Sequence, residues 1–371
     1  MVLVVAAIVA AAAAGAMVAF AYSGSTPGEV YRVWLDGRRI DVSRSSADDT
    51  FPVVSPNGLR VAFVSDRAGG APHLYLVGTD GNGLERVSSA LQTDQSLLHQ
   101  VAWSPDSKRL AVALPGGVLY VIGPGRLQRV VAARPPILLT PAWSPDGRMI
   151  AFDIGTSRSP GTEVVSAAGK RSWHVRGRRI GSGSLVGWGW SATGRLAIGR
   201  GATIRVYDES GRLQMSFPGR SYACSPEGAH LATVTSGRLE VHTLSGRILF
   251  RESVPELHRN QRNGLVWADK NHILIGGTGT SSVRAISVDI MSGRISTGNN
   301  RYFGMLSPDR RLVAEVATVG RSVALRVSRL DGSRMQTLAR RAPCPDLIEG
   351  DIQWLPDSRS LVYDLKCQPN H

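Results

Sequence analysis

Short apolar runs recur along the chain, and a polar turn separates the members of each pair. The clearest examples are AWSPDSKRLAV at 102–112 and AWSPDGRMIAF at 142–152. Pro145 presets the φ angle that the second position of a turn needs, Asp146 can accept bonds from nearby backbone, and Gly147 tolerates positive φ. Each stretch therefore predicts two antiparallel strands joined by a hairpin turn.

This strand–turn–strand pattern is repeated eight times. The copies are VSPNGLRVAF (54–63), WSPDSKRLAV (103–112), WSPDGRMIAF (143–152), WSATGRLAIG (190–199), CSPEGAHLAT (224–233), WADKNHILIG (267–276), LSPDRRLVAE (306–315) and WLPDSRSLVY (354–363). Five of the eight tryptophans stand directly before the turn: Trp103, Trp143, Trp190, Trp267 and Trp354. A repeat of this period indicates a solenoid, an array or a propeller.

Two further strands follow each copy, so one unit has four strands and is typical of a propeller blade. Seven units are complete, whereas the eighth is divided between residues 352–366 and 31–43. We predict an all-β chain, a β-propeller of eight four-stranded blades, with seven as the alternative because the units at Ser191 and Ala268 depart most from the pattern. The N-terminal strands would close the ring by joining the C-terminal blade, which removes exposed sheet edges.

The N-terminal residues differ in composition from the repeats. Residues 1–21 carry no charged side chain and are long enough to span a membrane as one apolar helix. They predict either a transmembrane anchor or a signal peptide cleaved after Ala21, where Ala19-Phe20-Ala21 fits a cleavage site. Both alternatives place the propeller (31–366) outside the cytoplasm, membrane-anchored or secreted, after a linker at 22–30 and before a tail at 367–371.

The first repeat resembles a known family. The stretch SPNGLRVAFVSDRAGGAPHLYLVGTDGNGLERVS (55–88) is similar to the repeat of TolB-like propellers, with its Ser-Pro-Asp-Gly turn, basic residue, Ser-x-Arg element and Asp-Gly turn. The resemblance implies the propeller fold and a role as a protein-binding scaffold in the bacterial envelope; similar propellers also form the non-catalytic domain of prolyl-oligopeptidase-like hydrolases. The family propeller commonly has six blades behind a small domain, and this chain differs on both counts.

The three cysteines are interpreted from their places in the repeat. Cys224 takes the position before the turn that Trp takes elsewhere, so we expect a small buried apolar side chain. Cys344 precedes the first strand of the last blade and Cys367 follows its second strand. Antiparallel neighbours bring those two ends to the same side, so we predict a Cys344–Cys367 disulfide in an oxidising compartment.

The charge is strongly basic, with 43 Lys and Arg against 29 Asp and Glu and a net charge of +14. For an exported chain we do not expect nucleic acid as the partner. The alternatives are an Arg-rich solvated surface and attraction to anionic lipid or wall polymer. Clusters at Arg176, Arg178 and Arg179, and at Arg340 and Arg341, are the first candidates for such binding.

Binding residues in propellers tend to lie on loops that the blades hold in place. The loops predicted at 89–100, 253–264 and 340–351 are long and mixed in polarity. Within the second of them, His258, Arg259 and Arg262 are the candidate ligand-binding residues. An envelope protein is the partner that we expect.

Catalytic motifs are missing from the sequence. It contains neither G-x-S-x-G nor H-E-x-x-H, and its eight histidines lack metal-ligand spacing. Asp80 with Asn82, and the Gly-rich stretch 276–282, are interpreted as turns. We expect no catalytic residues, metal or cofactor, and two functions remain: a non-catalytic extracytoplasmic scaffold or sensor, and a lyase-type or lactonase-type enzyme with acidic or His side chains around a central channel.

Overall fold

The computed structural model describes most of the repeat region. The described residues are 28–69, 71–87, 101–114, 118–124, 126–132, 141–155, 160–179, 190–200, 202–219, 221–235, 237–243, 245–254, 263–277, 286–297, 305–319, 322–330, 333–341, 346–349, 352–364 and 366–368. In this part of the chain the regular elements are strands, and no helix is long and apolar enough to cross a membrane. The predicted anchor or signal peptide at 1–21 lies outside the described residues and stays a prediction.

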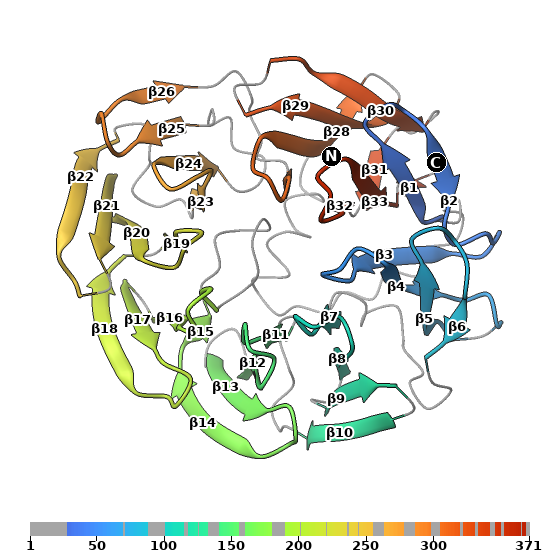
Figure 1. The fold of residues 1–371 in the computed structure, drawn as a ribbon, viewed down its shortest axis with the longest axis horizontal. Coiled ribbons are helices and arrows are strands. Elements are labelled where there is room, and N and C mark those ends of the chain that lie inside the picture. Colours follow the sequence, from blue (N-terminus) through green and yellow to red (C-terminus); the bar gives the residue numbers. More distant parts are fainter. Residues whose placement is uncertain are drawn as a thin grey trace. The chain divides into compact units, whose positions relative to one another are not determined.

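Eight four-stranded antiparallel sheets confirm the all-β propeller and its eight blades (Figure 1). In blades 1 to 4 the strands run in chain order across each sheet. Blade 1 has β3 (Asp49–Val54), β4 (Arg60–Ser65), β5 (His73–Gly78) and β6 (Glu85–Arg86); blade 2 has β7 (Val101–Trp103), β8 (Leu110–Leu114), β9 (Val118–Gly123) and β10 (Arg126–Ala132); blade 3 has β11 (Ala142–Trp143), β12 (Met149–Gly155), β13 (Pro160–Ser166) and β14 (Arg171–Arg176); blade 4 has β15 (Arg178–Arg179), β16 (Leu196–Arg200), β17 (Thr203–Tyr207) and β18 (Leu213–Pro218).

Blades 5 to 7 follow the same order. Blade 5 has β19 (Ser221–Cys224), β20 (His230–Thr235), β21 (Arg238–Thr243) and β22 (Ile248–Ser253); blade 6 has β23 (Asn263–Trp267), β24 (His272–Gly277), β25 (Ile286–Asp289) and β26 (Ile295–Thr297); blade 7 has β27 (Met305–Leu306), β28 (Leu312–Val319), β29 (Ser322–Arg329) and β30 (Gln336–Arg341). The units at Ser191 and Ala268, which depart most from the turn pattern, are therefore both true blades.

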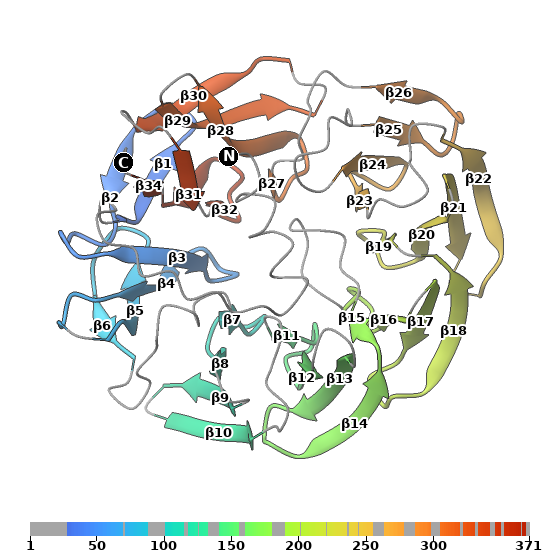
Figure 2. The same ribbon diagram turned by 180° about the vertical axis from the view of Figure 1, so that it is seen from behind.

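Blade 8 is assembled from the two ends of the repeat region. Its strands are β32 (Ile352–Trp354), β33 (Ser360–Tyr363), β1 (Tyr31–Trp34) and β2 (Arg39–Asp41), in that order across the sheet. β1 pairs antiparallel with β33 from Tyr31 opposite Tyr363 to Trp34 opposite Ser360. Figures 1 and 2 show the blue strands β1 and β2 beside the red strands β32 and β33. The predicted split of this blade is confirmed, while closure of the whole ring stays a prediction.

The segment after blade 7 differs from the prediction. We expected a loop at 340–351 and a tail at 367–371, but β30 continues to Arg341 and a separate two-stranded sheet joins β31 (Asp346–Glu349) to β34 (Lys366–Gln368). Asp346 pairs with Gln368, and Leu347 pairs with Cys367. The two short segments satisfy each other's backbone hydrogen bonds, a pairing that neither segment predicts alone because each is only three or four residues long.

The hydrophobic core consists of layers between neighbouring sheets. The chain divides into two compact units, one containing blades 3 to 6 and the other blades 7, 8 and 1, and the division passes through blade 2. In the first unit, Ile204 and Phe217 of blade 4 pack with Tyr222 of blade 5. In the second, Val61 and Val77 of blade 1 pack with Val362 of blade 8. The central strands supply apolar side chains from both faces, as in β4, where five of the six residues are buried.

Candidate functional site

The repeated tryptophans join neighbouring blades. In four described pairs the indole Nε1 donates a hydrogen bond to a carbonyl oxygen on the first strand of the preceding blade. The bonds are Trp103 to Val53 (2.9 Å), Trp190 to Ala142 (3.2 Å), Trp267 to Ala223 (2.9 Å) and Trp354 to Met305 (2.8 Å). Each acceptor stands two residues before the turn of its own blade. The register of the tryptophans in the sequence therefore has a structural cause, because a buried indole N–H needs an acceptor.

Polar side chains within each turn form hydrogen bonds to other groups of the same turn. In blade 3 the Ser144 hydroxyl donates to Asp146 Oδ1 at 2.6 Å and accepts from the Met149 amide at 2.9 Å. Gly147 has a φ of 69°, and its amide donates to the Ser144 carbonyl at 2.9 Å. In blade 2 the equivalent hydrogen bond from Ser104 holds the pKa of Asp106 below its ordinary value. Carboxylates held in this way are ionised turn acceptors at neutral pH.

One turn links two blades directly. Ser107 of blade 2 has a φ of 59° at the position where blade 3 has Gly147. Its hydroxyl oxygen accepts a hydrogen bond from the backbone amide of Asn57 in blade 1 at 3.0 Å. Blades 7 and 8 use the same contact, in which the Asp309 amide donates to Ser358 Oγ at 2.9 Å and Ser358 has a φ of 54°.

A buried charged network lies at the other end of blade 1, where β4 leads to β5. The Arg67 guanidinium donates to Asp49 Oδ1 at 3.0 Å, to Ser65 Oγ at 2.9 Å and to the Ser43 carbonyl at 3.0 Å. Its Cζ atom also lies 5.1 Å from the ring centroids of both Phe63 and Tyr75. These contacts place a cation on an aromatic pair and beside a carboxylate.

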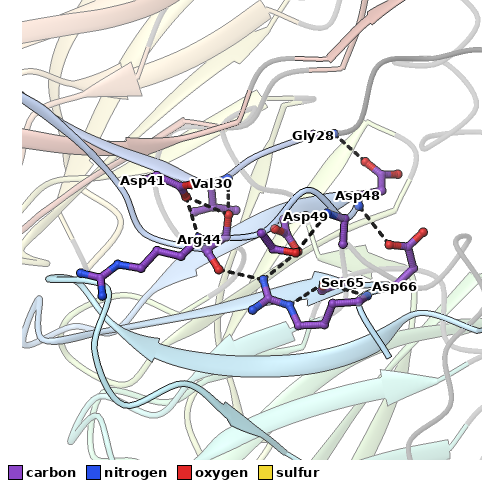
Figure 3. Close-up of polar contacts among 12 residues, drawn as sticks. Gly28, Val30, Asp41, Arg44, Asp48, Asp49, Ser65 and Asp66 are labelled. Atoms are coloured by element: carbon purple, nitrogen blue, oxygen red, sulfur yellow. Dashed lines mark hydrogen bonds and ion pairs between the residues drawn. The ribbon is translucent and has the colours of Figure 1, made fainter. Parts of the chain in front are cut away.

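The chain that enters blade 1 from blade 8 is bound to the same network (Figure 3). The Gly28 amide donates to Asp48 Oδ1 at 2.8 Å, and the Asp48 amide donates to Asp66 Oδ1 at 2.9 Å. The Val30 amide donates to Ser43 Oγ at 3.2 Å. Residues 28–30 and 41–49 are therefore bonded to each other and to blade 1 at the point where the split blade begins.

Asp49 is the most buried charged group of this network. Its side chain is 0 % exposed and that of Arg67 is 14 % exposed. Burial raises the pKa of Asp49, although hydrogen bonds from Ser65 and Arg67 oppose that shift. Within the described residues, Asp49 Oδ2 and His73 Nδ1 are buried without a hydrogen-bond partner. The main role of the network is to hold the entering chain, because Arg67 reaches three segments at once.

A second polar cluster in blade 5 has the residue types of a catalytic triad without its geometry. Thr233 Oγ1 and Glu240 Oε2 both lie 3.3 Å from the same ring nitrogen, Nε2 of His242. A catalytic triad uses both ring nitrogens, one toward the nucleophile and one toward the acid. Burial lowers the pKa of His242, and Glu240 is also bound by Arg251 at 2.8 Å. This cluster joins strands within a sheet.

Three of the predicted site residues stand at the passage from blade 3 to blade 4. Arg176 ends β14 and is exposed, and Arg178 and Arg179 form β15 after the single residue Gly177. Arg340, from the other cluster, is exposed near the end of β30. His258, Arg259 and Arg262 lie outside the described residues, so their role stays a prediction.

The structure describes two of the three cysteines, Cys224 and Cys367. Cys224 is half-buried, and burial raises its thiol pKa to about 11, so it is protonated at neutral pH. Cys367 lies in β34 opposite Leu347, four residues after Tyr363, the last residue of β33. Cys344 lies outside the described residues. The disulfide stays a prediction.

The sequence analysis missed the Arg67–Asp49 pair as a site. A signal was available, since Arg67 belongs to the Ser-x-Arg element at 65–67. Its partners could not be read from the sequence, because Asp49 and Ser43 are 18 and 24 residues away. Among the described residues no group of three or more His, Cys, Asp or Glu is placed to hold a metal ion.

Comparisons with known proteins agree with the fold. No family model matches the chain. The chain is similar to the Protein TolB homolog of Chlorobium luteolum, with 29% identity over 142 residues, which is 37% of this chain and 31% of that relative's length. Two solved structures are similar in fold: the C-terminal WD40 domain of Sif2 (TM-score 0.57, 14% identity, covering 86% of this chain and 95% of that one) and Sqt1 from Chaetomium thermophilum (TM-score 0.54, 13% identity, 85% and 95%).

The sheets, their connections and these similarities define the class of protein: a β-propeller built from WD-repeat-like, four-stranded blades. Within that class the chain is TolB-like, as the turn and Ser-x-Arg elements of blade 1 and the match to the Chlorobium relative both indicate.

Proposed function

We propose that the protein is a non-catalytic scaffold that binds a protein partner at the bacterial cell envelope. The observation that carries this proposal is the way the blades are joined. Indole N–H groups and turn serines bind adjacent blades through backbone atoms, and Arg67 fixes the entering chain. Such a frame suits recognition of another macromolecule, because binding residues tend to lie on loops that a rigid scaffold positions.

The chemistry of the described polar groups supports binding more than catalysis. The turn aspartates Asp106, Asp208 and Asp289 accept hydrogen bonds from serines of their own turns, and their pKa values are lowered. A general acid near neutral pH needs a raised pKa instead. Asp49 has one, but its carboxylate is fully buried beneath Arg67.

The envelope location is supported by the relative and by composition. The Chlorobium relative is named as a TolB homolog, and residues 1–21 of this chain are apolar and uncharged. We propose that these residues anchor the propeller on the outer side of the membrane or direct its secretion. The predicted Cys344–Cys367 disulfide fits the oxidising environment of that compartment.

Affinity capture tests the proposal. The full chain with a C-terminal tag is expressed in its host, membranes are solubilised in detergent, and the captured material is washed at low and then high salt. Exposed charge contacts are screened at high salt, where the Debye length is about 3 Å at 1 M. We expect a discrete protein to remain after the high-salt wash.

A matched pair of variants makes the capture specific. The variant His258→Ala/Arg259→Ala/Arg262→Ala changes the predicted binding loop, and Arg311→Ser/Arg329→Ser/Arg359→Ser removes three exposed arginines elsewhere. Loss of the partner with the loop variant alone would support that loop as the contact. If only lipid or polymer is recovered, and salt removes it, the scaffold proposal is wrong.

A further inference from the structure

Trp34 differs from the tryptophans that join neighbouring blades. It is the last residue of β1 in blade 8 and is half-buried. Among the described residues its indole Nε1 forms no hydrogen bond, whereas the four indoles described above each bond a carbonyl oxygen. An apolar ring with a free N–H is a side chain that protein interfaces favour, because it offers contact area and a donor together.

Two arginines and a closed turn hold the Trp34 ring in place. The Cζ atoms of Arg32 and Arg38 lie 4.3 Å and 5.3 Å from the ring centroid. The Trp34 amide donates to the Arg38 carbonyl at 2.8 Å, and the Gly37 amide donates to the Trp34 carbonyl at 2.9 Å. A ring held in this way loses little conformational freedom when it binds a partner.

Blade 1, the neighbour of blade 8, exposes apolar side chains in its turns (Figures 1 and 2). Leu59 is 66 % exposed between β3 and β4, and Leu84 is 46 % exposed between β5 and β6. Because the strands of this blade are antiparallel and in chain order, both turns lie at the same end of the sheet.

Arg32 connects the indole of blade 8 to these turns of blade 1. Its Nη1 donates to Thr79 Oγ1 at 3.4 Å, and the Thr79 amide donates to the Leu59 carbonyl at 3.0 Å. The first turn also packs on blade 8, since a Cβ atom on Gly58 would lie 2.8 Å from Cδ of Pro356. The apolar side chains at this joint form one surface, which we name the Trp34 surface: Trp34, Leu59 and Leu84.

The charges beside the Trp34 surface are balanced. Each arginine that stacks on the indole or adjoins Leu59 has a carboxylate partner: Arg32 with Asp357 (3.6 Å), Arg38 with Asp36 (2.8 Å) and Arg60 with Glu85 (3.3 Å). An apolar centre within a polar rim is the arrangement of a protein interface, whereas docking on anionic lipid uses basic residues that are free to attract it. The balance therefore favours a protein segment without net charge.

The place where the chain enters blade 8 also favours protein over lipid. β1 runs from Tyr31 to Trp34, so Gly28 and the Trp34 surface lie at opposite ends of this blade. If residues 1–21 anchor the chain as proposed, the six residues 22–27 can extend at most about 20 Å from the membrane. Such a tether keeps the Gly28 end near the membrane and the Trp34 surface away from it.

We propose that the Trp34 surface binds an apolar, uncharged segment of a protein partner. An apolar side chain of that segment packs on the Trp34 ring and Leu59, and one of its carbonyl oxygens accepts a hydrogen bond from Trp34 Nε1. This inference rests on the proposed scaffold function and names one contact of the scaffold.

Site-specific photo-crosslinking of the full chain in its host tests the inference. The photoreactive residue p-benzoylphenylalanine takes the place of Leu59, and the control chain carries it in place of Leu213, which is 49 % exposed in blade 4. We expect a discrete protein adduct from position 59 and none from position 213. The crosslinked segment, identified by mass spectrometry, should be rich in apolar residues and have no net charge.

A labelled peptide with the sequence of the crosslinked segment then measures affinity by fluorescence anisotropy. We expect Trp34→Ala to weaken binding about 30-fold, as for a Trp at the centre of an interface. Trp34→Phe keeps an apolar ring without the N–H and should fall between Ala and wild type. Leu59→Ser should weaken binding about fivefold and the control Leu213→Ser less than about twofold. Unchanged thermal unfolding identifies the folded variants.

Four outcomes would overturn the inference: no protein adduct from position 59, equal adducts from both positions, adducts only with lipid or with a second copy of this chain, and unchanged peptide affinity in Trp34→Ala. The proposed function is judged separately, by affinity capture. A partner that survives the high-salt wash without an adduct from position 59 would retain the scaffold and reject the surface. Neither a captured protein nor an adduct would reject both.

Discussion

At the scale of single residues, the structure explains why the turn positions are not interchangeable. The fourth position of the repeated turn has positive φ in blade 2 as in blade 3, yet blade 2 has Ser107 where blade 3 has Gly147. A non-glycine residue in this conformation costs roughly 1 kcal/mol. The hydroxyl of Ser107 offsets that cost by accepting the Asn57 amide of the neighbouring blade.

This balance predicts different effects for two substitutions of Ser107. Ser107→Ala keeps the strained backbone and loses the hydrogen bond, so we expect a loss of about 1–2 kcal/mol. Ser107→Gly loses the hydrogen bond but relieves the backbone, so it should be about 1 kcal/mol more stable than the Ala variant. Equilibrium unfolding in urea measures both, with Gly147→Ala as the control for backbone strain alone. A Gly variant less stable than the Ala variant would contradict this account.

At the scale of elements, the split blade depends on contacts that hold its N-terminal strands to blade 1. Arg67 lies between β4 and β5 and reaches both Asp49 at the start of β3 and the Ser43 carbonyl after β2. The Arg67–Asp49 pair is largely removed from solvent, with side chains 14 % and 0 % exposed. Loss of one partner would leave a buried charge without compensation.

We therefore expect Arg67→Met to destabilise the protein by about 3–5 kcal/mol. Asp49→Asn in the same chain should restore part of that loss, because the uncompensated charge is then gone. The control is Arg60→Met, whose partner Glu85 is 58 % exposed and which should cost less than about 1 kcal/mol. Chemical unfolding of wild type, Arg67→Met, Asp49→Asn and the double variant forms a double-mutant cycle. Equal effects of Arg67→Met and Arg60→Met would reject a structural role for the network.

At the scale of the whole molecule, the repeated turns predict how stability responds to acid. The pKa values of Asp106, Asp208 and Asp289 lie below the ordinary value of 3.8 because serine hydroxyls of their turns bond the carboxylates. A carboxyl with a lowered pKa in the folded state stabilises the fold above pH 3.8, and that contribution is lost as the pH falls through the folded pKa. Asp49 acts in the opposite direction, since its pKa is raised and its ionisation disfavours the fold.

Three turn aspartates have a lowered pKa and Asp49 has a raised one. We therefore expect the midpoint of thermal unfolding to decrease as the pH is lowered from 5 to 3. The double variant Asp106→Asn/Asp208→Asn keeps an oxygen acceptor in each turn but cannot be protonated in this range. Its midpoint should fall less over the same interval, as calorimetry can measure. Identical slopes for the variant and wild type would show that these turns do not carry the acid sensitivity.

Local signals in the sequence predicted much of the fold. The short apolar runs, the turn residues Pro145, Asp146 and Gly147 between them, and the repeated Trp were sufficient for the eight sheets and for the split blade. Strand period and turn chemistry depend on a few neighbouring residues, so they can be read without a structure. The candidate site was predicted less well: the Arg67 network was missed, and the binding role of Arg176, Arg178 and Arg179 stays a prediction.

By itself, then, the sequence determined the class of fold, the number of blades and the place of each turn, because these follow from local conformational preferences repeated along the chain. Only the tertiary structure decided which distant residues meet. Arg67 finds Asp49 and the Ser43 carbonyl, and β31 finds β34. Such contacts depend on how separate strands are aligned, and a shift of one residue would reverse the face of every side chain in a strand.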